Sequence, residues 1–336
     1  MESKPKIAVF IMCSGNFFFF LENFYRTAEK FLFPNCDKTY FIFTDHKRCI
    51  LAEEFDNIKL IDLDMESMNS KKYGNLSLMK FQLISHNSDL FEGYDYIWYS
   101  NLNVIFTGVV PETYLPTDDK LVLVEHISPL IAGRSYDTND FEKNPKSAAF
   151  VPREKFITYV YGGVNFGKTK PYLEYVNECL DGVERDLDNG VIAKWHDESH
   201  TNRYLSFHPE KCKVLYNNYD SFVSPQQNVG LMKYPKMIKM IFLEKSWYGG
   251  HAMFRSTDEK VCRDIKFRDD DVEEWFIIYL SGNIEDTAKI RKNVIFCARS
   301  FKTGYIACRT KNKIGIIWDN GGLEYFRKFS DGSYRK

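Results

Sequence analysis

The alternation of apolar and polar stretches in the first part of the chain predicts strands separated by a helix. A continuous apolar run at 6–13 ends in a Ser-Gly-Asn turn, which is typical of a buried strand that enters a loop. Apolar residues then recur at near-helical spacing over 20–31, with charged residues between them. Two further apolar runs, 39–45 and 58–63, have the length of strands. This strand–helix–strand order predicts an α/β protein with a largely parallel sheet covered by helices on both faces.

The middle of the chain continues the same alternation. The segments 75–85 and 169–189 have helical patterns, and 94–99, 121–125 and 159–167 have strand patterns. The last of these strands contains a double glycine, which indicates either a bulge, the commoner case, or the close approach of another backbone or a ligand. Ligands of such sheets bind at the carboxyl ends of the strands, so we expect the functional site there.

Composition restricts the class of protein. The 336 residues carry a formal net charge of −1, which gives no reason to expect nucleic acid or an anionic membrane as a partner. Eight cysteines are scattered without C-x-x-C or metal-binding spacing, as is typical of reduced thiols in a cytosolic protein. The early apolar run at 17–21 is followed at once by Glu22 and Asn23, unlike a signal peptide or a spanning helix. We expect a cytoplasmic protein without an integral membrane segment; peripheral membrane contact stays open.

Two short stretches concentrate polar chemistry. Residues 195–200, Trp-His-Asp-Glu-Ser-His, open a segment with a helical pattern. Carboxylates at a helix start face unpaired N–H groups and the positive end of the helix dipole, so a capped helix and a functional site explain the spacing equally well. Asn101 and Asn103 follow the strand at 94–99 and should project to one side, with Leu102 on the other. Taken alone, a strand-terminating asparagine pair is the simpler explanation.

A longer run around the first stretch carries a resemblance. Residues 190–204, Gly-Val-Ile-Ala-Lys-Trp-His-Asp-Glu-Ser-His-Thr-Asn-Arg-Tyr, resemble the signature of glycosyltransferase family 6, which includes the ABO histo-blood-group transferases and α1,3-galactosyltransferase. The elements up to 44–45 resemble the family's first uridine-binding unit, and 147–152 resembles the loop before its donor-site strand. Tyr161-Gly162-Gly163 stands where the family sets donor-sugar choice. The resemblance implies a GT-A type nucleotide-sugar transferase fold, with a Rossmann-like mixed, mainly parallel sheet flanked by helices.

The resemblance ends near residue 255 and so implies two parts. Residues 1–255 would form the GT-A catalytic domain, and 256–336 a C-terminal extension. Short apolar runs separated by Gly, Asn and charged turns predict that this extension is a small β-rich unit. Carbohydrate binding, partner binding and simple packing are all open as its role.

The resemblance also bears on metal and charge. Vertebrate members hold Mn²⁺ with an Asp-x-Asp motif, and Asn101 and Asn103 stand at those positions here. Asparagine is a neutral, weak ligand for a hard cation, so we expect no Mn²⁺ requirement and no other cofactor, as in bacterial members with Asn-x-Asn. Lys80 stands where the family has an arginine that contacts sugar and phosphate. Lys245 and Arg255 lie near the basic residues that close over UDP.

By resemblance, the activity is the retaining transfer of a sugar from a UDP donor to the 3-OH of galactose. Glu198 would lie beneath the anomeric carbon, where a carboxylate stabilises oxocarbenium-like charge or forms a covalent glycosyl intermediate. The remaining implied contacts are with the donor sugar (Asp197, His196, Lys80, Tyr161, Gly162, Gly163), the nucleotide (Met12, Cys13, Ser14, Phe17, Asn101, Asn103, Lys245, Arg255) and the acceptor (Trp195, His126, Ser128). Core packing explains Met12, Cys13 and Phe17 equally well.

The glycine pair bears on the donor. Small residues at Gly162 and Gly163 leave space for a 2-acetamido group and favour UDP-GalNAc over UDP-Gal, although Tyr161 is unusual before the pair. The expected acceptor is an oligosaccharide that contains galactose, fucosylated as in H-antigen-like glycans. Two other functions stay open: an α1,3-galactosyltransferase that uses UDP-Gal, and a catalytically idle glycan-binding protein of the same fold.

Overall fold

A computed structural model describes most of the chain and divides it into two compact units. The described residues are 3–46, 49–63, 76–217, 222–225, 238–243, 245, 274–280, 284–291, 294–297, 303–309, 313–318, 323–328 and 334–335. The first unit consists of Met1–Ser14, Phe33–Leu102 and Pro111–Asn218, and the second of Gly15–Leu32, Asn103–Val110 and Tyr219–Lys336.

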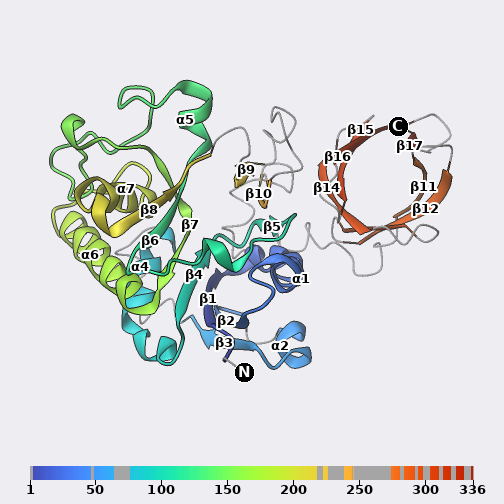
Figure 1. Ribbon diagram of the computed structural model, residues 1–336, viewed down its shortest axis with the longest axis horizontal. Coiled ribbons are helices and arrows are strands. Elements are labelled where there is room, and N and C mark those ends of the chain that lie inside the picture. The colour runs from blue at the N-terminus through green and yellow to red at the C-terminus, as the bar shows by residue number, and fades with distance from the viewer. Residues whose placement is uncertain are drawn as a thin grey trace. The chain divides into compact units, whose positions relative to one another are not determined.

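The first unit is built on a seven-stranded sheet in the order β3-β2-β1-β4-β7-β6-β8 (Figure 1). Its strands are β1 (Lys6–Cys13), β2 (Asp37–Thr44), β3 (Ile58–Asp62), β4 (Tyr96–Ser100), β6 (Leu121–Glu125), β7 (Val160–Lys168) and β8 (Cys212–Leu215). Neighbouring strands are parallel except that β7 is antiparallel to both β4 and β6. The predicted α/β class with a mainly parallel sheet is confirmed.

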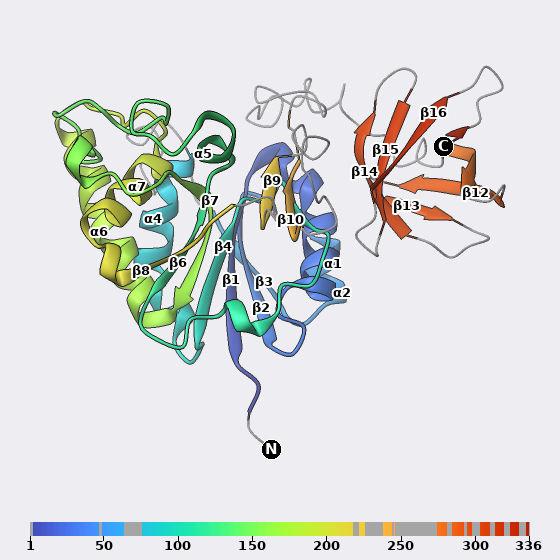
Figure 2. The same cartoon turned by 45° about the horizontal axis from the view of Figure 1, so that its top comes forward.

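Helices α4, α6 and α7 of the first unit pack against one another over one face of this sheet (Figure 2). The helices of the unit are α2 (Ile50–Glu54), α4 (Leu76–His86), α5 (Ile127–Ala132), α6 (Thr169–Asp188) and α7 (Asp197–Phe207), and its 3-10 turns are η2 (Ser88–Phe91), η3 (Glu112–Tyr114), η4 (Arg153–Lys155) and η5 (Pro209–Lys211). The short helix α5 was not predicted, because its six residues are too few to show a period.

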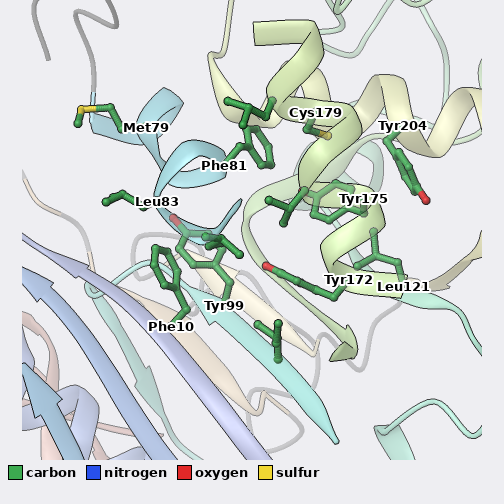
Figure 3. Packing of buried hydrophobic residues seen from close by; sticks show 14 of the residues in the cluster. Phe10, Met79, Phe81, Leu83, Tyr99, Leu121, Tyr172, Tyr175, Cys179 and Tyr204 are labelled. Carbon is green, nitrogen blue, oxygen red and sulfur yellow. The ribbon is translucent and has the colours of Figure 1, made fainter. Parts of the chain in front are cut away.

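An aromatic core joins these helices to the sheet (Figure 3). Tyr175 of α6 meets Phe81 of α4 edge to face at 5.8 Å and Tyr204 of α7 at 5.0 Å between ring centroids. On the sheet, Phe10 of β1 and Tyr99 of β4 lie 5.8 Å apart. Buried aromatic pairs contribute about 0.5–1.5 kcal/mol each beyond their buried area, so this layer fixes where α7 starts relative to β4 and β7.

The strand order creates a switch point between β1 and β4. These two parallel strands are neighbours, while the chain leaves β1 toward β2 and returns from β3 to β4 on the other side. Crevices at such points are the usual ligand sites of open α/β sheets. Because β7 runs antiparallel to β4, its first residues lie at the same edge as the carboxyl ends of β1 and β4.

Buried thiols and helix lengths complete the description of the fold. The described free cysteines are all buried: Cys13, Cys36, Cys49, Cys179 and Cys212. Among the residues that the structure describes, no helix combines the length and apolarity needed to cross a membrane.

The second unit contains a three-stranded sheet in the order β5-β10-β9 and, separately, a closed sheet. The elements around the first of these are η1 (Gly15–Phe20), α1 (Leu21–Phe31), β5 (Val104–Phe106), β9 (Val223–Pro225) and β10 (Met240–Phe242). Helix α1 packs on β5, where the rings of Phe24 and Phe106 lie 5.8 Å apart and Thr27 Oγ1 accepts a hydrogen bond from the Phe106 N–H at 3.2 Å.

The closed sheet of the second unit contains seven strands near the C-terminus. They are β11 (Glu274–Leu280), β12 (Ile284–Arg291), β13 (Val294–Cys297), β14 (Thr303–Arg309), β15 (Lys313–Trp318), β16 (Leu323–Lys328) and β17 (Tyr334–Arg335). Consecutive strands are antiparallel, and a parallel pairing of β11 with β17 closes the ring. The predicted domain boundary at residue 255 lies outside the described residues.

Candidate active site

The turn into α7 places two carboxylates at the edge of the sheet. The N–H of Glu198 donates to the carbonyl of Trp195 at 3.0 Å, which closes a turn whose first central residue is His196, at φ 52° and ψ −123°. The N–H of Trp195 donates to Ser199 Oγ at 3.0 Å, so both ends of the turn are tied down. Asp197 and Glu198 therefore occupy the first helical turn, where the helix dipole favours negative charge.

Lys80 of α4 forms a buried ion pair with Asp197. The Lys80 Nζ lies 2.6 Å from Asp197 Oδ2 and 3.1 Å from the Gly162 carbonyl oxygen, and 4.4 Å from the centroid of the Tyr99 ring. The Lys80 side chain is 0% exposed, so in this conformation its charge acts on a ligand through Asp197. Direct phosphate contact by Lys80 stays a prediction. Tyr99 also donates to Asn101 Oδ1 at 2.9 Å, which links the ion pair to the end of β4.

Glu198 receives one hydrogen bond on each carboxylate oxygen. The Tyr159 hydroxyl donates to Oε1 at 2.6 Å, and the Gly162 N–H donates to Oε2 at 2.9 Å. Burial raises the pKa of Glu198 to about 7, against the opposing effect of these two donors. The side chain is nevertheless partly open to solvent, so a substrate can reach a carboxylate whose charge is poorly solvated.

Gly162 is needed where β7 passes under α7. A Cβ atom at this position would lie 2.6 Å from both Cα and Cβ of Glu198 and 2.9 Å from its backbone nitrogen. The pairing of β7 with β6 shifts register between Asn165 and Val160, a stretch that contains the glycine pair, and Gly162 also lies close to the backbone of Glu198. Both predicted reasons for a glycine, a bulge and close backbone approach, therefore apply here. The identity of Gly162 thus has a packing cause that is independent of the donor sugar.

Buried Tyr161 and half-buried His126 and Ser128 form a small group next to Glu198 in the fold. The Tyr161 hydroxyl accepts from the Ile127 N–H at 3.3 Å, and its ring centroid lies 4.2 Å from that of His126. His126 Nδ1 caps α5 by accepting from the Ser128 N–H at 3.0 Å. Burial lowers the pKa of His126 to about 4, so the ring is neutral at physiological pH. The proposed acceptor residues His126 and Ser128 are thus held by Tyr161 and by the start of α5, and the His126 ring carries no charge.

The predicted nucleotide residues of the first unit lie at the switch point. Met12 and Ser14 are half-buried at the end of β1, whereas Cys13 is fully buried, and burial holds its pKa well above the ordinary thiol value. Core packing thus accounts for Cys13. The Asn101 N–H donates to the Gly163 carbonyl at 2.8 Å, so the ends of β4 and β7 are joined at this edge.

The other predicted nucleotide residues belong to the second unit. Asn103 and Leu243 exchange two hydrogen bonds, because Asn103 Nδ2 donates to the Leu243 carbonyl at 2.8 Å and the Leu243 N–H donates to the Asn103 carbonyl at 2.7 Å. The Lys245 Nζ lies 5.1 Å from the centroid of the Phe17 ring. Arg255 lies outside the described residues.

Trp195, two residues before Asp197 in the sequence, is an exposed aromatic residue of the site. It is 45% exposed, and the Lys194 ammonium lies 5.8 Å from its ring centroid. An exposed indole beside a polar site offers an apolar face on which a sugar ring can stack.

Two contacts of the site were missed at the sequence level. Tyr159 was placed only in a strand, although tyrosines at 159 and 161 near a strand end could have drawn attention to their hydroxyls. Asn202 was placed in a helix and within the family signature but given no role. Its side chain exchanges hydrogen bonds with both backbone groups of Val160 at 2.9 Å and also donates to the Glu198 carbonyl at 2.8 Å. Asn202 therefore joins α7 to the first residue of β7.

The asparagine pair does not suit Mn²⁺. Asn101 and Asn103 present neutral oxygens, and the Asn103 amide nitrogen is committed to a main-chain carbonyl. Within the described part of the chain, no three His, Cys, Asp or Glu side chains are grouped so that they could hold a metal ion.

Comparison with known proteins gives a consistent result. A model of glycosyltransferase family 6 matches residues 2–247. The O-antigen biosynthesis glycosyltransferase WbnI of Escherichia coli is 26% identical over 245 residues, which cover 72% of this chain and 97% of that protein. The Histo-blood group ABO system transferase 1 of Rattus norvegicus is 26% identical over 230 residues, covering 68% of this chain and 63% of the rat protein. The Globoside alpha-1,3-N-acetylgalactosaminyltransferase 1 of Homo sapiens is 24% identical over 209 residues, covering 61% and 58%.

The match includes the sheet, the switch point and the turn that carries Asp197 and Glu198. With nearly three quarters of its length inside the family model, the chain belongs to glycosyltransferase family 6.

Proposed function

We propose that this glycosyltransferase moves GalNAc from UDP-GalNAc to the 3-OH of a galactose acceptor, with retention of configuration and without a metal ion. The observation that carries the proposal is the half-buried Glu198, held by two hydrogen bonds, beside the buried Lys80–Asp197 ion pair. Family membership supports transfer from a nucleotide sugar to a glycan.

Each carboxylate has a separate task in the proposed reaction. Asp197, oriented by its ion pair with Lys80, accepts hydrogen bonds from the donor-sugar hydroxyls. Glu198 lies beneath the anomeric carbon, where its charge stabilises the oxocarbenium-like transition state as the bond to UDP breaks. Because the carboxylate is poorly solvated in the free enzyme, it interacts more strongly with positive charge that develops only in the transition state. Trp195 supports the acceptor ring.

No step is assigned to a metal. The two asparagines lack the charge that Mn²⁺ needs, so the leaving diphosphate would be neutralised by side chains. Lys245, next to Phe17, is the described residue that we propose for this role.

The donor and linkage rest on the relatives and on one glycine. The name of the human relative specifies α1,3 transfer of N-acetylgalactosamine. Because packing already explains Gly162, the remaining sequence argument for GalNAc is the small residue at Gly163. A galactose-terminated, fucosylated glycan is proposed as acceptor by analogy with the rat blood-group transferase.

The test is turnover with both donors and a panel of galactose-terminated acceptors, in EDTA and in Mn²⁺. We expect UDP release and transfer from UDP-GalNAc in EDTA, and a kcat lower by about 10³-fold for Glu198→Gln. Glu174→Gln, which neutralises an exposed carboxylate on α6, is the matched control and should behave as wild type.

Each part of the proposal has a result that contradicts it. A strict Mn²⁺ requirement would exclude the metal-free mechanism, and a clear preference for UDP-Gal would exclude the donor. Wild-type rates for Glu198→Gln would remove this carboxylate from the mechanism. Glycan binding without hydrolysis or transfer would identify an idle binding protein.

A further inference from the structure

Tyr159 donates a short side-chain hydrogen bond to Glu198. Its hydroxyl lies 2.6 Å from Oε1, while the Gly162 N–H holds Oε2 at 2.9 Å. Two donors on the two oxygens fix the plane of the carboxylate, and each oxygen keeps a lone pair for another contact. Burial and the neighbouring Glu198 raise the pKa of Tyr159, so the phenol stays protonated and remains a donor.

An aromatic cluster holds the Tyr159 ring in place. The ring is 2% exposed and meets Phe141 edge to face at 5.1 Å between centroids. Phe141 in turn stacks on Tyr136 at 5.6 Å and meets Phe156 edge to face at 5.5 Å. The ring of His126 meets Tyr159 at 5.5 Å. Since these neighbours fill the space around the ring, the hydroxyl has little freedom to leave Glu198.

We propose that Tyr159 is a positioning residue that orients the Glu198 carboxylate and, through its hydrogen bond to Oε1, favours the ionised form. The inference rests on the function proposed above for Glu198. It adds that ring packing by Phe141 holds Tyr159 in place for this role.

The charges around Glu198 set the direction of the effect. Burial is the largest influence and raises the pKa of Glu198; the hydrogen bonds from Tyr159 and Gly162 lower it, Asp197 raises it, and Lys80 lowers it.

Tyr161 and His126, whose rings pack nearby, do not compete with Tyr159. Tyr161 is neutral because burial raises its pKa, and His126 is neutral because burial lowers its pKa to about 4. Removing the Tyr159 hydroxyl thus takes away a hydrogen bond to the charged form and should raise the pKa of Glu198 further.

The first test is the pH dependence of UDP release by Tyr159→Phe. The reaction needs the carboxylate, so the rate rises with pH through the pKa of Glu198. We expect the midpoint of the rate profile to move up by about one pH unit. At pH values below both midpoints the rate of UDP release should fall about tenfold, and at high pH the variant should keep most of the wild-type rate. Tyr136→Phe removes a hydroxyl from the same cluster, where it donates to the Val151 carbonyl at 2.7 Å, and should leave the midpoint unchanged.

A second readout does not depend on activity. The free energy of unfolding is measured as a function of pH for the wild type and Glu198→Gln, and again for Tyr159→Phe and the double variant that carries both substitutions. Between the ordinary carboxyl pKa and about pH 7, Glu198 is ionised in the unfolded chain but still protonated in the fold. The wild type therefore loses stability relative to Glu198→Gln as the pH rises to about 7, and no further above it. In the pair that carries Tyr159→Phe, this loss should continue to higher pH and become larger.

The two readouts separate the two claims. If Tyr159→Phe leaves both midpoints where they are in the wild type, the inference is wrong. If the wild-type enzyme releases no UDP at any pH, the proposed function fails, and the unfolding curves still decide the role of Tyr159.

Discussion

Replacing Gly162 with alanine tests whether this position serves packing or donor choice. The new Cβ would lie 2.6 Å from Cα and Cβ of Glu198, whereas carbon atoms in contact normally lie about 3.5 Å apart. The start of α7 must therefore move by about 1 Å. Overpacking of this kind typically costs about 1–3 kcal/mol of stability. A displacement of about 1 Å at a catalytic group can lower kcat about 100-fold.

The assay is kcat for UDP-GalNAc and UDP-Gal, together with the midpoint of denaturant unfolding. If packing determines position 162, Gly162→Ala lowers kcat for both donors by a similar factor and destabilises the fold. If the position reads the donor sugar, the variant keeps its stability and shifts its preference toward UDP-Gal, and the packing argument is refuted. Gly108→Ala is the control, because its Cβ would make ordinary contacts, the nearest of them with the flexible Lys239 side chain at 3.4 Å.

Two buried polar contacts of the site give further predictions. Lys80→Met should destabilise the protein by about 3–5 kcal/mol, because Asp197 is left as an unpaired buried charge, and the double variant with Asp197→Asn should recover much of this loss in chemical denaturation. Asn103→Asp should cost about 1–3 kcal/mol, since a carboxylate cannot donate to the Leu243 carbonyl, and its turnover should not rise when Mn²⁺ replaces EDTA. Asn101→Asp keeps an acceptor oxygen for the hydroxyl of Tyr99 and should be closer to wild type in stability. If Mn²⁺ raises the turnover of Asn103→Asp, the argument that this position does not serve a metal is contradicted.

The helices and strands could be predicted where burial produces a continuous apolar run or a regular helical spacing of apolar residues in the sequence. Strand β1 was predicted with its observed limits, Lys6–Cys13, because both faces of a central parallel strand are buried and the run is apolar throughout. Helix α6 was predicted to within a residue of Thr169–Asp188. Strand β12, Ile284–Arg291, was missed because half of its residues are charged and it contains no apolar run.

Only the residues of the site that belong to a sequence motif or to the family resemblance could be predicted. The motif indicated Asp197 and Glu198, and the resemblance indicated Lys80, but the 2.6 Å contact between Tyr159 and Glu198 depends on where β7 begins relative to α7. The partner of Asn103 is 140 positions away, and no local pattern links the two. Contacts of this kind are set by packing between elements, which a linear pattern does not encode.

The backbone conformation of His196 gives the turn before α7 an energetic cost. At φ 52° and ψ −123° it occupies the first central position of a type II′ turn, where a side chain is disfavoured and glycine fits best. A residue with a Cβ atom in such a conformation costs about 1–3 kcal/mol. By backbone conformation alone, glycine would be the better residue at this position. The turn that presents Asp197 and Glu198 therefore carries a local conformational cost, which the hydrogen bonds that close it help to offset.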